Sequence, residues 1–285
     1  MTTLLADLLG LIRLERLELN LFRGESRDIG SPQVFGGQVL GQALMAASET
    51  VTERVVHSLH AYFLRRGDFN APIIYEVDRS RDGKSFSSRR VVAIQHGEQI
   101  FHLAASFQAE EEGPDHQVEA PNVTPPEELT DLASEVRRYL PEMPAERRRF
   151  WSLQRPFEFR SVEPLRSGEP RPGVRHLWFR LTEPCPEDQT LQRCLLAYMS
   201  DYHLLETATL PHALSYPRGD VTLASIDHGM WFHRPVDMND WLLYALESPS
   251  SSGSRGFAMG SIFDRQGRLV ASTVQEGLMR VRVKS

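Results

Sequence analysis

An acid, a hydroxyl and an amide in the second half of the chain are residue types that together can hold and activate water. Cys194, Tyr198 and Asp201 follow one another at spacings of four and three residues, which places them on one face of a predicted helix. Ser225 and Gln275 lie in two predicted strands. A carboxylate accepts a proton from water, while a hydroxyl and an amide fix the direction of the molecule. Spacing alone leaves open whether the three side chains converge.

The predicted position of Asp201 carries an energetic cost. Beside an apolar helix face, a carboxylate costs several kcal/mol unless it is protonated or hydrogen-bonded. The C-terminal half of a helix disfavours negative charge by a further ~0.3–1 kcal/mol. The alternative is that Asp201 lies at the edge of the apolar face and reaches solvent, with Ser225 and Gln275 facing solvent as well.

Two similar sets of elements surround these residues. Ala61–Asp68 aligns with Met230–Asp237 at an offset of 169 residues, and Ala104–Gln108 aligns with Ala271–Gln275 at an offset of 167. The near-constant offset indicates a duplicated unit. The predicted elements are helix 38–51 with strands 55–65, 72–80, 86–95 and 99–108, then helix 190–208 with strands 223–234, 241–248, 254–264 and 268–283. This pattern predicts an α+β fold in which each helix packs on an antiparallel sheet.

An acidic, proline-rich segment separates the two units. The stretch from Glu111 to Val136 contains four prolines and many acids with almost no apolar periodicity, which is typical of a linker. We therefore expect an N-terminal unit over residues 1–112, a linker over residues 113–150 and a C-terminal unit over residues 151–285 that carries Asp201. A short helix at residues 127–139 is expected inside the linker.

The composition excludes several classes of protein. The 285 residues carry a formal net charge of −6, whereas nucleic-acid binding needs a basic face, so no nucleic-acid partner is expected. Cys185 and Cys194 are the two cysteines, and they provide neither a disulfide framework nor a cysteine-based zinc motif. The N-terminal apolar run is interrupted by Asp7, and no stretch reaches the ~18 apolar residues of a membrane span. A cytoplasmic protein is the default expectation.

Two further patterns do not develop into sites. Gly36–Ala43 has the glycine spacing of a phosphate loop without its lysine, so its small residues are expected to pack the helix closely against a sheet. His57 and His60, and likewise His228 and His233, are an odd number of residues apart, which places the members of each pair on opposite faces of a strand. No metal site is predicted, and His228 and His233 are expected to be structural or to lie at the rim of a site.

Long stretches of the chain resemble the acyl-CoA thioesterase II family, the TesB-type enzymes. The resemblance is carried by FRGESRDIGSPQVFGGQVLGQAL, VHSLHAYFLRRGD, RDGKSFSSRRVVAIQ, ASIDHGMWFHRP, SRGF and VASTVQEGLMR, which occur in this order over nearly the whole chain. It implies a double hotdog, in which two tandem hotdog units each wrap an antiparallel sheet around a central helix. It also implies a homodimer or homotetramer that uses no metal or organic cofactor.

The resemblance implies roles for particular residues. An acid on a helix, a Thr or Ser and a Gln position the hydrolytic water in this family, and they correspond to Asp201, Ser225 and Gln275. Relatives often carry Thr at the position of Ser225, and Ser keeps the hydroxyl. The helix of the first unit offers no equivalent acid, which implies one functional site. Candidate substrate-binding residues are Arg65, Arg66 and Arg255 for the phosphates of coenzyme A, and Met230 and Trp231 for the acyl chain.

The expected activity is hydrolysis of fatty acyl-CoA to free fatty acid and coenzyme A. Asp201 would act as a general base, or it would attack the thioester directly and form an anhydride. A hydratase is an alternative with the same fold, but Ile73 occupies the position of the hydratase histidine. A further alternative is a non-catalytic acyl-CoA-binding or regulatory protein that keeps the fold without the chemistry.

Overall fold

The structure is a computed structural model that describes residues 3–164 and 168–282. Residues 165–167 and 283–285 of the expected C-terminal unit, among them the last residue of the predicted strand 268–283, lie outside the described part. The elements of the first half are α1 (Leu4–Ile12), β1 (Glu15–Glu18), β2 (Leu21–Gly24), α2 (Gly36–Ser48), β3 (Val55–Phe63), β4 (Ile73–Asp82), β5 (Phe86–Gln95) and β6 (Glu98–Gln108).

The remaining elements begin with short helices in the expected linker. They are η1 (Pro126–Glu128), α3 (Leu132–Arg137), η2 (Leu140–Glu142), α4 (Ala145–Ser152), β7 (Phe157–Ser161), β8 (Val174–Leu181), α5 (Gln189–Ser200), η3 (Leu205–His212), β9 (Val221–Ser225), β10 (Asp227–Phe232), β11 (Leu242–Ser252), β12 (Arg255–Phe263) and β13 (Leu269–Val281). Strands β7 and β8 were not predicted from the sequence, and they extend the sheet of the second half at its far edge.

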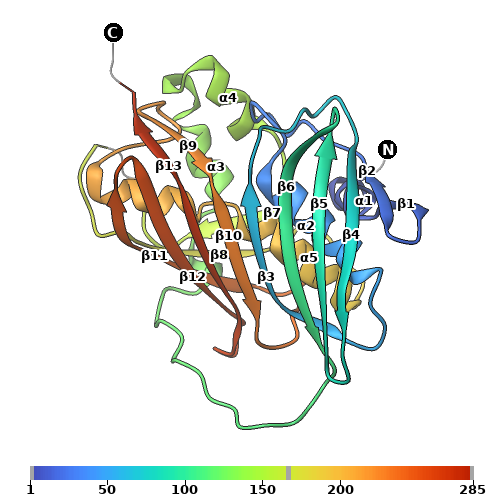
Figure 1. The fold of residues 1–285 in the computed structure, drawn as a ribbon. Helices are drawn as coiled ribbons and strands as arrows, with labels where there is room; N and C mark the ends of the chain where they lie inside the picture. Colours follow the sequence, from blue (N-terminus) through green and yellow to red (C-terminus); the bar gives the residue numbers. More distant parts are fainter. Residues whose placement is uncertain (1–2, 165–167, 283–285) are drawn as a thin grey trace.

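The described strands form one continuous antiparallel sheet. Its order is β1-β2-β4-β5-β6-β3-β10-β13-β12-β11-β8-β7, and β9 pairs with β13. Strands β3 and β10 pair in the middle, with Leu59 opposite Met230, and so join the two halves of the chain (Figure 1). The order β3-β6-β5-β4-β2 on one side mirrors β10-β13-β12-β11-β8 on the other. The duplication read from the sequence is therefore also a duplication of topology.

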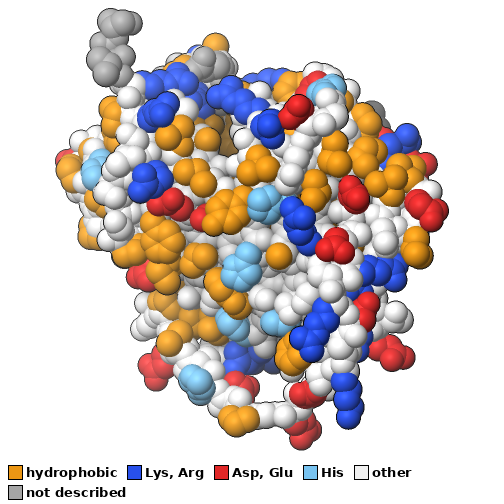
Figure 2. Space-filling model, in the orientation of Figure 1, with side chains coloured by type: hydrophobic (Ala, Val, Ile, Leu, Met, Phe, Trp, Pro, Cys, Tyr) orange, Lys and Arg blue, Asp and Glu red, His pale blue; other side chains and the backbone are white. Residues whose placement is uncertain are grey.

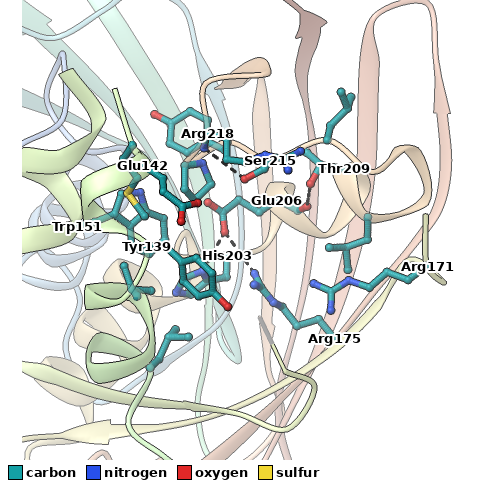
Figure 3. A pocket seen from close by; sticks show the side chains of 17 residues that line it. Tyr139, Glu142, Trp151, Arg171, Arg175, His203, Glu206, Thr209, Ser215 and Arg218 are labelled. Carbon is teal, nitrogen blue, oxygen red and sulfur yellow. Dashed lines mark hydrogen bonds and ion pairs between the residues drawn. The ribbon is translucent and has the colours of Figure 1, made fainter. Parts of the chain in front are cut away.

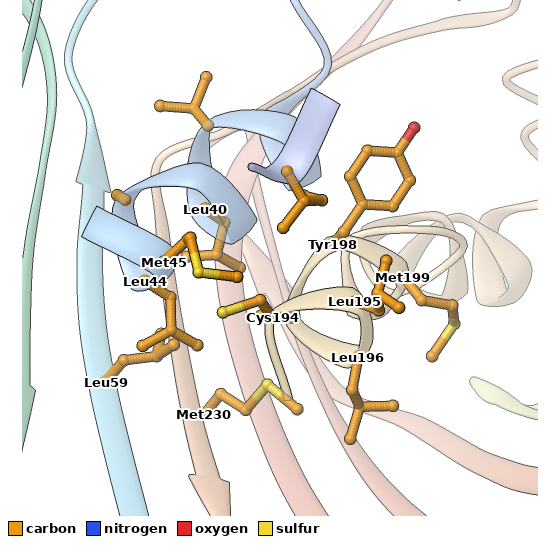
Figure 4. Close-up of a cluster of buried hydrophobic side chains, with 14 of the residues drawn as sticks. Leu40, Leu44, Met45, Leu59, Cys194, Leu195, Leu196, Tyr198, Met199 and Met230 are labelled. Carbon is orange, nitrogen blue, oxygen red and sulfur yellow. The ribbon is translucent and has the colours of Figure 1, made fainter. Parts of the chain in front are cut away.

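The core lies between the inner face of this sheet and the two long helices α2 and α5. Leu44 of α2 and Leu195 of α5 belong to one buried cluster, to which β3 and β10 contribute Leu59 and Met230 (Figure 4). The alternating burial along the strands, for example in β5, supplies the inward-facing residues of this cluster. Because the cluster spans both halves, the two units share one core.

Glycines in α2 allow it to pack directly against α5. A Cβ atom added to Gly37 would lie 2.2 Å from the carbonyl oxygen of Tyr198, and one added to Gly41 would lie 3.0 Å from the carbonyl oxygen of Cys194. Only the absence of a side chain permits this approach of the two backbones. The expectation that these small residues pack against a sheet is thus corrected, because their close partner is the other helix.

Two predicted elements are divided in the structure. The predicted helix 190–208 ends as α5 at Ser200, with Asp201 as its C-cap, because His203 adopts a left-handed φ of 65° that an α-helix does not tolerate. The chain then continues as η3. The predicted strand 223–234 is interrupted at Ile226, so that β9 pairs with β13 alone whereas β10 pairs with both β13 and β3.

The histidines of β3 correct a further expectation. The register between β3 and β6 shifts between Val56 and Ser58, which makes His57 the extra residue of a β-bulge. The ring of His57 contacts the Ser106 hydroxyl at 2.8 Å and Phe86, while His60 packs edge-on against Trp231. Because the bulge interrupts the alternation, His57 and His60 lie on the same outer face of the sheet.

The expected linker is more ordered than its composition suggested. Gln117 donates a hydrogen bond to the carbonyl oxygen of Gly267 at 2.7 Å, and the indole N–H of Trp178 donates one to the carbonyl oxygen of Thr124 at 2.9 Å. The segment 126–152 then forms η1, α3, η2 and α4, of which α4 lies at the upper edge of the molecule (Figure 1). Within the described residues, no helix combines the length and apolarity needed to cross a membrane.

Candidate active site

Asp201 lies where the C-terminal end of α5 meets the N-terminal end of α2. Helix α2 begins at Gly36 without a side-chain cap, and the backbone N–H of Gly37 donates a hydrogen bond to the Asp201 carboxylate. A Cβ atom at Gly36 would lie 2.6 Å from Oδ2 of Asp201, so this position must lack a side chain. The free N–H groups and the positive end of the α2 dipole favour a carboxylate here. The first half thus offsets part of the cost of ionising Asp201.

Ser225 and Gln275 meet Asp201 in the structure. Nε2 of Gln275 donates a hydrogen bond to Oδ1 of Asp201 at 2.8 Å, and the Ser225 hydroxyl makes a longer contact of 3.4 Å with the same oxygen. The register of β9 on β13 places Ser225 opposite Gly277, two residues from Gln275 and therefore on the same face. The convergence that spacing could not establish is observed.

The environment of Asp201 shifts its acid–base behaviour. Burial raises the pKa of its carboxyl from 3.8 to about 6, although the hydrogen bonds from Gln275, Gly37 and Ser225 act in the opposite direction. A carboxylate of this pKa is mostly ionised at neutral pH and still accepts a proton readily, which suits general base catalysis. The three donors keep the carboxylate in one orientation.

The Gln275 amide is held by a second partner, His228. Nε2 of Gln275 lies 3.1 Å from Nδ1 of His228, and Nε2 of His228 lies 3.0 Å from the Ser200 hydroxyl. His228 and Gln275 are both fully buried, and Oε1 of Gln275 has no hydrogen-bond partner in the described part of the chain. Burial lowers the pKa of His228 to about 3, so the imidazole is neutral. The sequence had marked His228 as a structural or rim residue without indicating this contact.

His233 and the acid at the end of α2 lie outside this group. The His233 ring contacts the Ser272 hydroxyl at 2.9 Å in an exposed position. Helix α2 has an acid, Glu49, at its C-cap, which is the position that Asp201 takes in α5. The sequence reading had found no equivalent acid in the first half. Glu49 is exposed, however, and it does not line the cavity around Asp201.

An open cavity of about 360 Å³ adjoins Asp201, Ser225 and Gln275. Its walls come from both halves and from the linker. They include residues 31–35, the first residue of α2, helix α4, the start of η3 and strand β9. Arg66, Arg147 and Arg282 also line it. Figure 2 shows cationic side chains gathered along the upper edge of the molecule, over α4 and the end of β13. A cavity of this size with cationic walls suits a long anionic ligand.

Only Arg66 of the five candidate substrate-binding residues lines this cavity. Arg65 points elsewhere and pairs with Glu98 at 3.1 Å, and Arg255 pairs with Glu276 at 2.9 Å beside a different surface hollow. Met230 and Trp231 follow one another on β10, and consecutive strand residues face opposite sides of a sheet. Met230 is accordingly buried in the core and Trp231 packs on His60 at the outer face (Figure 4).

A second cavity adjoins the first through shared wall residues. Trp151, His203, Glu206 and Tyr216 line both cavities. Figure 3 shows Trp151, His203 and Glu206 in the wall of the second cavity. Glu206 contacts Nδ1 of His203 at 3.0 Å and the Arg175 guanidinium at 3.3 Å. Burial opposes ionisation of Glu206, but these two partners outweigh it and lower the pKa of the carboxyl to about 2. The sequence did not indicate this polar wall, because Arg175 belongs to the unpredicted strand β8 and meets His203 and Glu206 only in the folded structure.

A bound metal ion needs several ligating side chains that converge on one point. Within residues 3–164 and 168–282, no group of three or more His, Cys, Asp or Glu side chains is arranged to hold an ion.

Comparison with known proteins identifies the family. A family model described as acyl-CoA thioesterase matches residues 150–278, and one described as acyl-CoA thioesterase N-terminal domain matches residues 23–108. The acyl-CoA thioesterase 2 of Haemophilus influenzae is 45% identical to this chain over 98% of this chain and 99% of that protein. The chain belongs to the acyl-CoA thioesterase family.

More distant members extend this assignment to a eukaryotic relative and to a solved structure. Human acyl-coenzyme A thioesterase 8 is 41% identical over 95% of this chain and 88% of that protein. The crystal structure of the acyl-CoA thioesterase II TesB2 from Mycobacterium marinum matches with a TM-score of 0.79 and 39% identity, covering 96% of this chain and 98% of that chain. The predicted family and the predicted double hotdog fold are both confirmed.

Proposed function

We propose that this thioesterase family member hydrolyses fatty acyl-CoA to free fatty acid and coenzyme A. The observation that carries the proposal is the Asp201 carboxylate, whose pKa burial raises to about 6 and which Gln275 and Ser225 hold in place at a large open cavity. The names of the relatives, acyl-CoA thioesterase 2 and acyl-coenzyme A thioesterase 8, support the same reaction.

In the proposed reaction, Asp201 activates a water molecule. The water donates one hydrogen bond to the Asp201 carboxylate and the other to Oε1 of Gln275, which has no partner in the described residues. Its oxygen then attacks the thioester carbon while Asp201 takes the proton. The Ser225 hydroxyl restricts the orientation of the carboxylate through its contact with Oδ1.

The intermediate needs stabilisation of a negative oxygen. The N-terminal end of α2 presents the Gly36 N–H and the positive end of the helix dipole on the side of Asp201, while the Gly37 N–H already donates to the Asp201 carboxylate. We assign the oxyanion to this helix end. When the intermediate collapses, the C–S bond breaks, the electron pair leaves with the sulfur of coenzyme A, and the proton held by Asp201 passes to the thiolate.

The cationic side chains of the cavity suit the phosphates of coenzyme A. Arg66 and Arg282 are exposed at the cavity, while Arg147 is buried and stacks on the Tyr216 ring at 4.0 Å. We assign phosphate binding to Arg66 together with these two arginines. Arg65 and Arg255 already pair with acids outside the cavity and are not part of this assignment.

An assay of thiol release over a series of acyl-CoA chain lengths tests the proposed activity. The expected result is release of free thiol with at least one chain length, in step with the appearance of fatty acid. The alternative is a non-catalytic acyl-CoA-binding or regulatory protein. Binding of acyl-CoA without release at any chain length would support that alternative and contradict the proposed hydrolysis.

We further propose that the protein is cytoplasmic and self-associates as a homodimer or homotetramer. The two cysteines, Cys185 and Cys194, are free and buried, which is compatible with a reducing compartment. Tyr62, Phe86 and Met259 are exposed apolar side chains, and a partner copy would cover such surface. Light scattering on the purified protein is expected to give two or four times the mass of one chain, and a monomer would contradict the proposed assembly.

A further inference from the structure

The Gln275 amide occupies an environment that permits only one orientation. Its nitrogen carries two hydrogens, and it has two acceptors within reach: Oδ1 of Asp201 at 2.8 Å and Nδ1 of His228 at 3.1 Å. If the amide were reversed, Oε1 would face the carboxylate oxygen and the imidazole nitrogen instead. Two acceptors would then oppose a third acceptor in a fully buried position, which is strongly unfavourable.

The two acceptors do not contribute equally to the orientation of the Gln275 amide. The hydrogen bond to Asp201 varies with the charge of the carboxylate, because Asp201 gains and loses a proton in each proposed turnover. The hydrogen bond to His228 lasts through the whole cycle, provided that Nδ1 keeps its lone pair. The orientation of Gln275 therefore depends on the tautomer of His228.

Ser200 selects that tautomer. The Ser200 hydroxyl donates its own hydrogen to the carbonyl oxygen of Ala197 at 2.8 Å, so its oxygen is free to accept one. Nε2 of His228 lies 3.0 Å away and must supply that hydrogen, which leaves Nδ1 without a proton. Burial lowers the pKa of His228 to about 3, so the ring does not carry a second proton at neutral pH.

We propose that His228, held in its Nε2–H tautomer by Ser200, is a positioning residue that turns Oε1 of Gln275 toward the hydrolytic water. The hydrogen bonds run in one direction, from Gln275 to His228, from His228 to Ser200 and from Ser200 to the backbone of α5. Oε1 is the atom of this network that is buried and without a partner in the described chain. The inference rests on the proposed hydrolysis, in which Oε1 accepts a hydrogen bond from the attacking water.

A matched pair of substitutions separates positioning from packing. In His228→Asn, the amide oxygen can take the place of Nδ1 and accept the hydrogen bond from Gln275. In His228→Gln, the longer side chain reaches the position of Nε2 and presents no acceptor at the position of Nδ1. We expect His228→Asn to keep most of kcat and His228→Gln to lower kcat by roughly 100-fold, the cost of misplacing a reacting group, with little change in KM.

A double-mutant cycle with Gln275→Ala tests whether His228 acts through Gln275. If it does, adding His228→Gln to Gln275→Ala lowers kcat no further, because the side chain that His228 positions is already gone. Effects that multiply would overturn the proposal, as would equal losses in His228→Asn and His228→Gln. Melting temperatures of the variants show which of them are folded.

Nitrogen NMR of the protein labelled at histidine measures the tautomer of His228 directly. This measurement requires neither catalytic activity nor a folded variant at position 228. We expect one neutral imidazole with its proton on Nε2, and we expect Gln275→Ala to shift its Nδ1 signal. A proton on Nδ1 would overturn the proposal. Absence of thiol release from the unmodified protein would instead contradict the proposed function, while the NMR result would still report the tautomer.

Discussion

At the scale of single residues, Asp201 combines a chemical function with a cost in stability. Its carboxyl has a pKa of about 6 in the folded protein, compared with 3.8 in its usual environment. The folded state therefore binds this proton more tightly than the unfolded chain. As the pH rises from 3.8 to about 6, ionisation of Asp201 lowers the free energy of unfolding, by ~3 kcal/mol in all.

The substitution Asp201→Asn is expected to separate function from stability. Loss of the general base should lower kcat by roughly 10²–10⁴-fold. The amide has no charge to desolvate, so the melting temperature at pH 7 should equal or exceed that of the unmodified protein. Steady-state kinetics and thermal unfolding check the two parts. A variant that unfolds at lower temperature would make Asp201 a structural residue.

The pH dependence of kcat/KM should carry the signature of the same group. Because the base must be ionised, activity is expected to be full above the pKa of Asp201 and to fall as the pH drops through about 6. A pH profile measured with one acyl-CoA substrate checks this. An acid limb centred near 4 would contradict the raised pKa of Asp201 in the folded protein.

Arg66 and Arg65 offer a matched test of substrate binding. Arg66 lines the cavity of Asp201, while its neighbour Arg65 pairs with Glu98 outside it. Arg66→Ala should raise KM for acyl-CoA by roughly 10- to 100-fold, in line with the ~1.5–3 kcal/mol of a charged hydrogen bond, and Arg65→Ala should leave KM unchanged. Equal effects of the two substitutions would remove Arg66 from the proposed phosphate site.

The sequence was informative at this scale for residue types and less so for contacts. Asp201, Ser225 and Gln275 could be named from motif and helix spacing, and they lie together, although their catalytic roles stay predictions. The contact between Gln275 and His228 depends on how β10 and β13 are paired, which opposes Gly229 to Val274. Pairing register between strands far apart in the chain cannot be read from local patterns.

At the scale of elements, the site is built from two helix ends. Helix α5 ends at Ser200, directly before Asp201. Helix α2 begins at Gly36, and the next backbone N–H, that of Gly37, donates a hydrogen bond to the Asp201 carboxylate. Apolar periodicity predicted that both helices exist. It placed the end of α5 too late, because the left-handed backbone at His203 leaves no signal in the pattern of apolar residues.

Gly36→Ala tests the junction of these two helices. The added Cβ would lie 2.6 Å from Oδ2 of Asp201, so the carboxylate must move away from the α2 N-terminus. A displacement of this size is expected to lower kcat by roughly 100-fold. Gly10→Ala in α1 is the matched control, because nothing lies within 4 Å of its added Cβ. Full activity of Gly36→Ala would contradict the placement of the site at this helix end.

The control substitution also has an expected effect of its own. Gly10 lies inside α1, where alanine restricts the unfolded chain more than glycine, so Gly10→Ala should stabilise the protein by roughly 0.5–1 kcal/mol without changing kcat. Thermal unfolding measures this difference. The two glycines are therefore distinguished by their surroundings and not by their residue type.

At the scale of the whole molecule, the two units form one sheet around one core. Strands β3 and β10 join the halves, and α2 packs on α5. The repeat and the class of fold were predictable because each unit keeps its own pattern of helix and strands. The joining of the sheets was not predicted. The edge strand β7 and its neighbour β8 were not predicted either, because Arg175, His176 and Arg180 interrupt the apolar residues of β8 and β7 is short. The linker helices that line the cavity were obscured by prolines and charges.

A shared core predicts cooperative unfolding of both units. Because the buried cluster includes residues of α2 and α5 together, neither half can unfold and leave the other half intact. Calorimetry is expected to show a single transition with equal calorimetric and van't Hoff enthalpies. Two separate transitions would show that the halves are independent units.

The central claim of this account is that Asp201 activates water instead of attacking the thioester. Single-turnover hydrolysis of an acyl-CoA in 18O water tests it most directly, with mass analysis of both the fatty acid and the peptide that contains Asp201. We expect the label to enter the fatty acid in the first turnover and the peptide to stay unlabelled. Label in the Asp201 carboxylate with unlabelled fatty acid would contradict the account and establish the anhydride route.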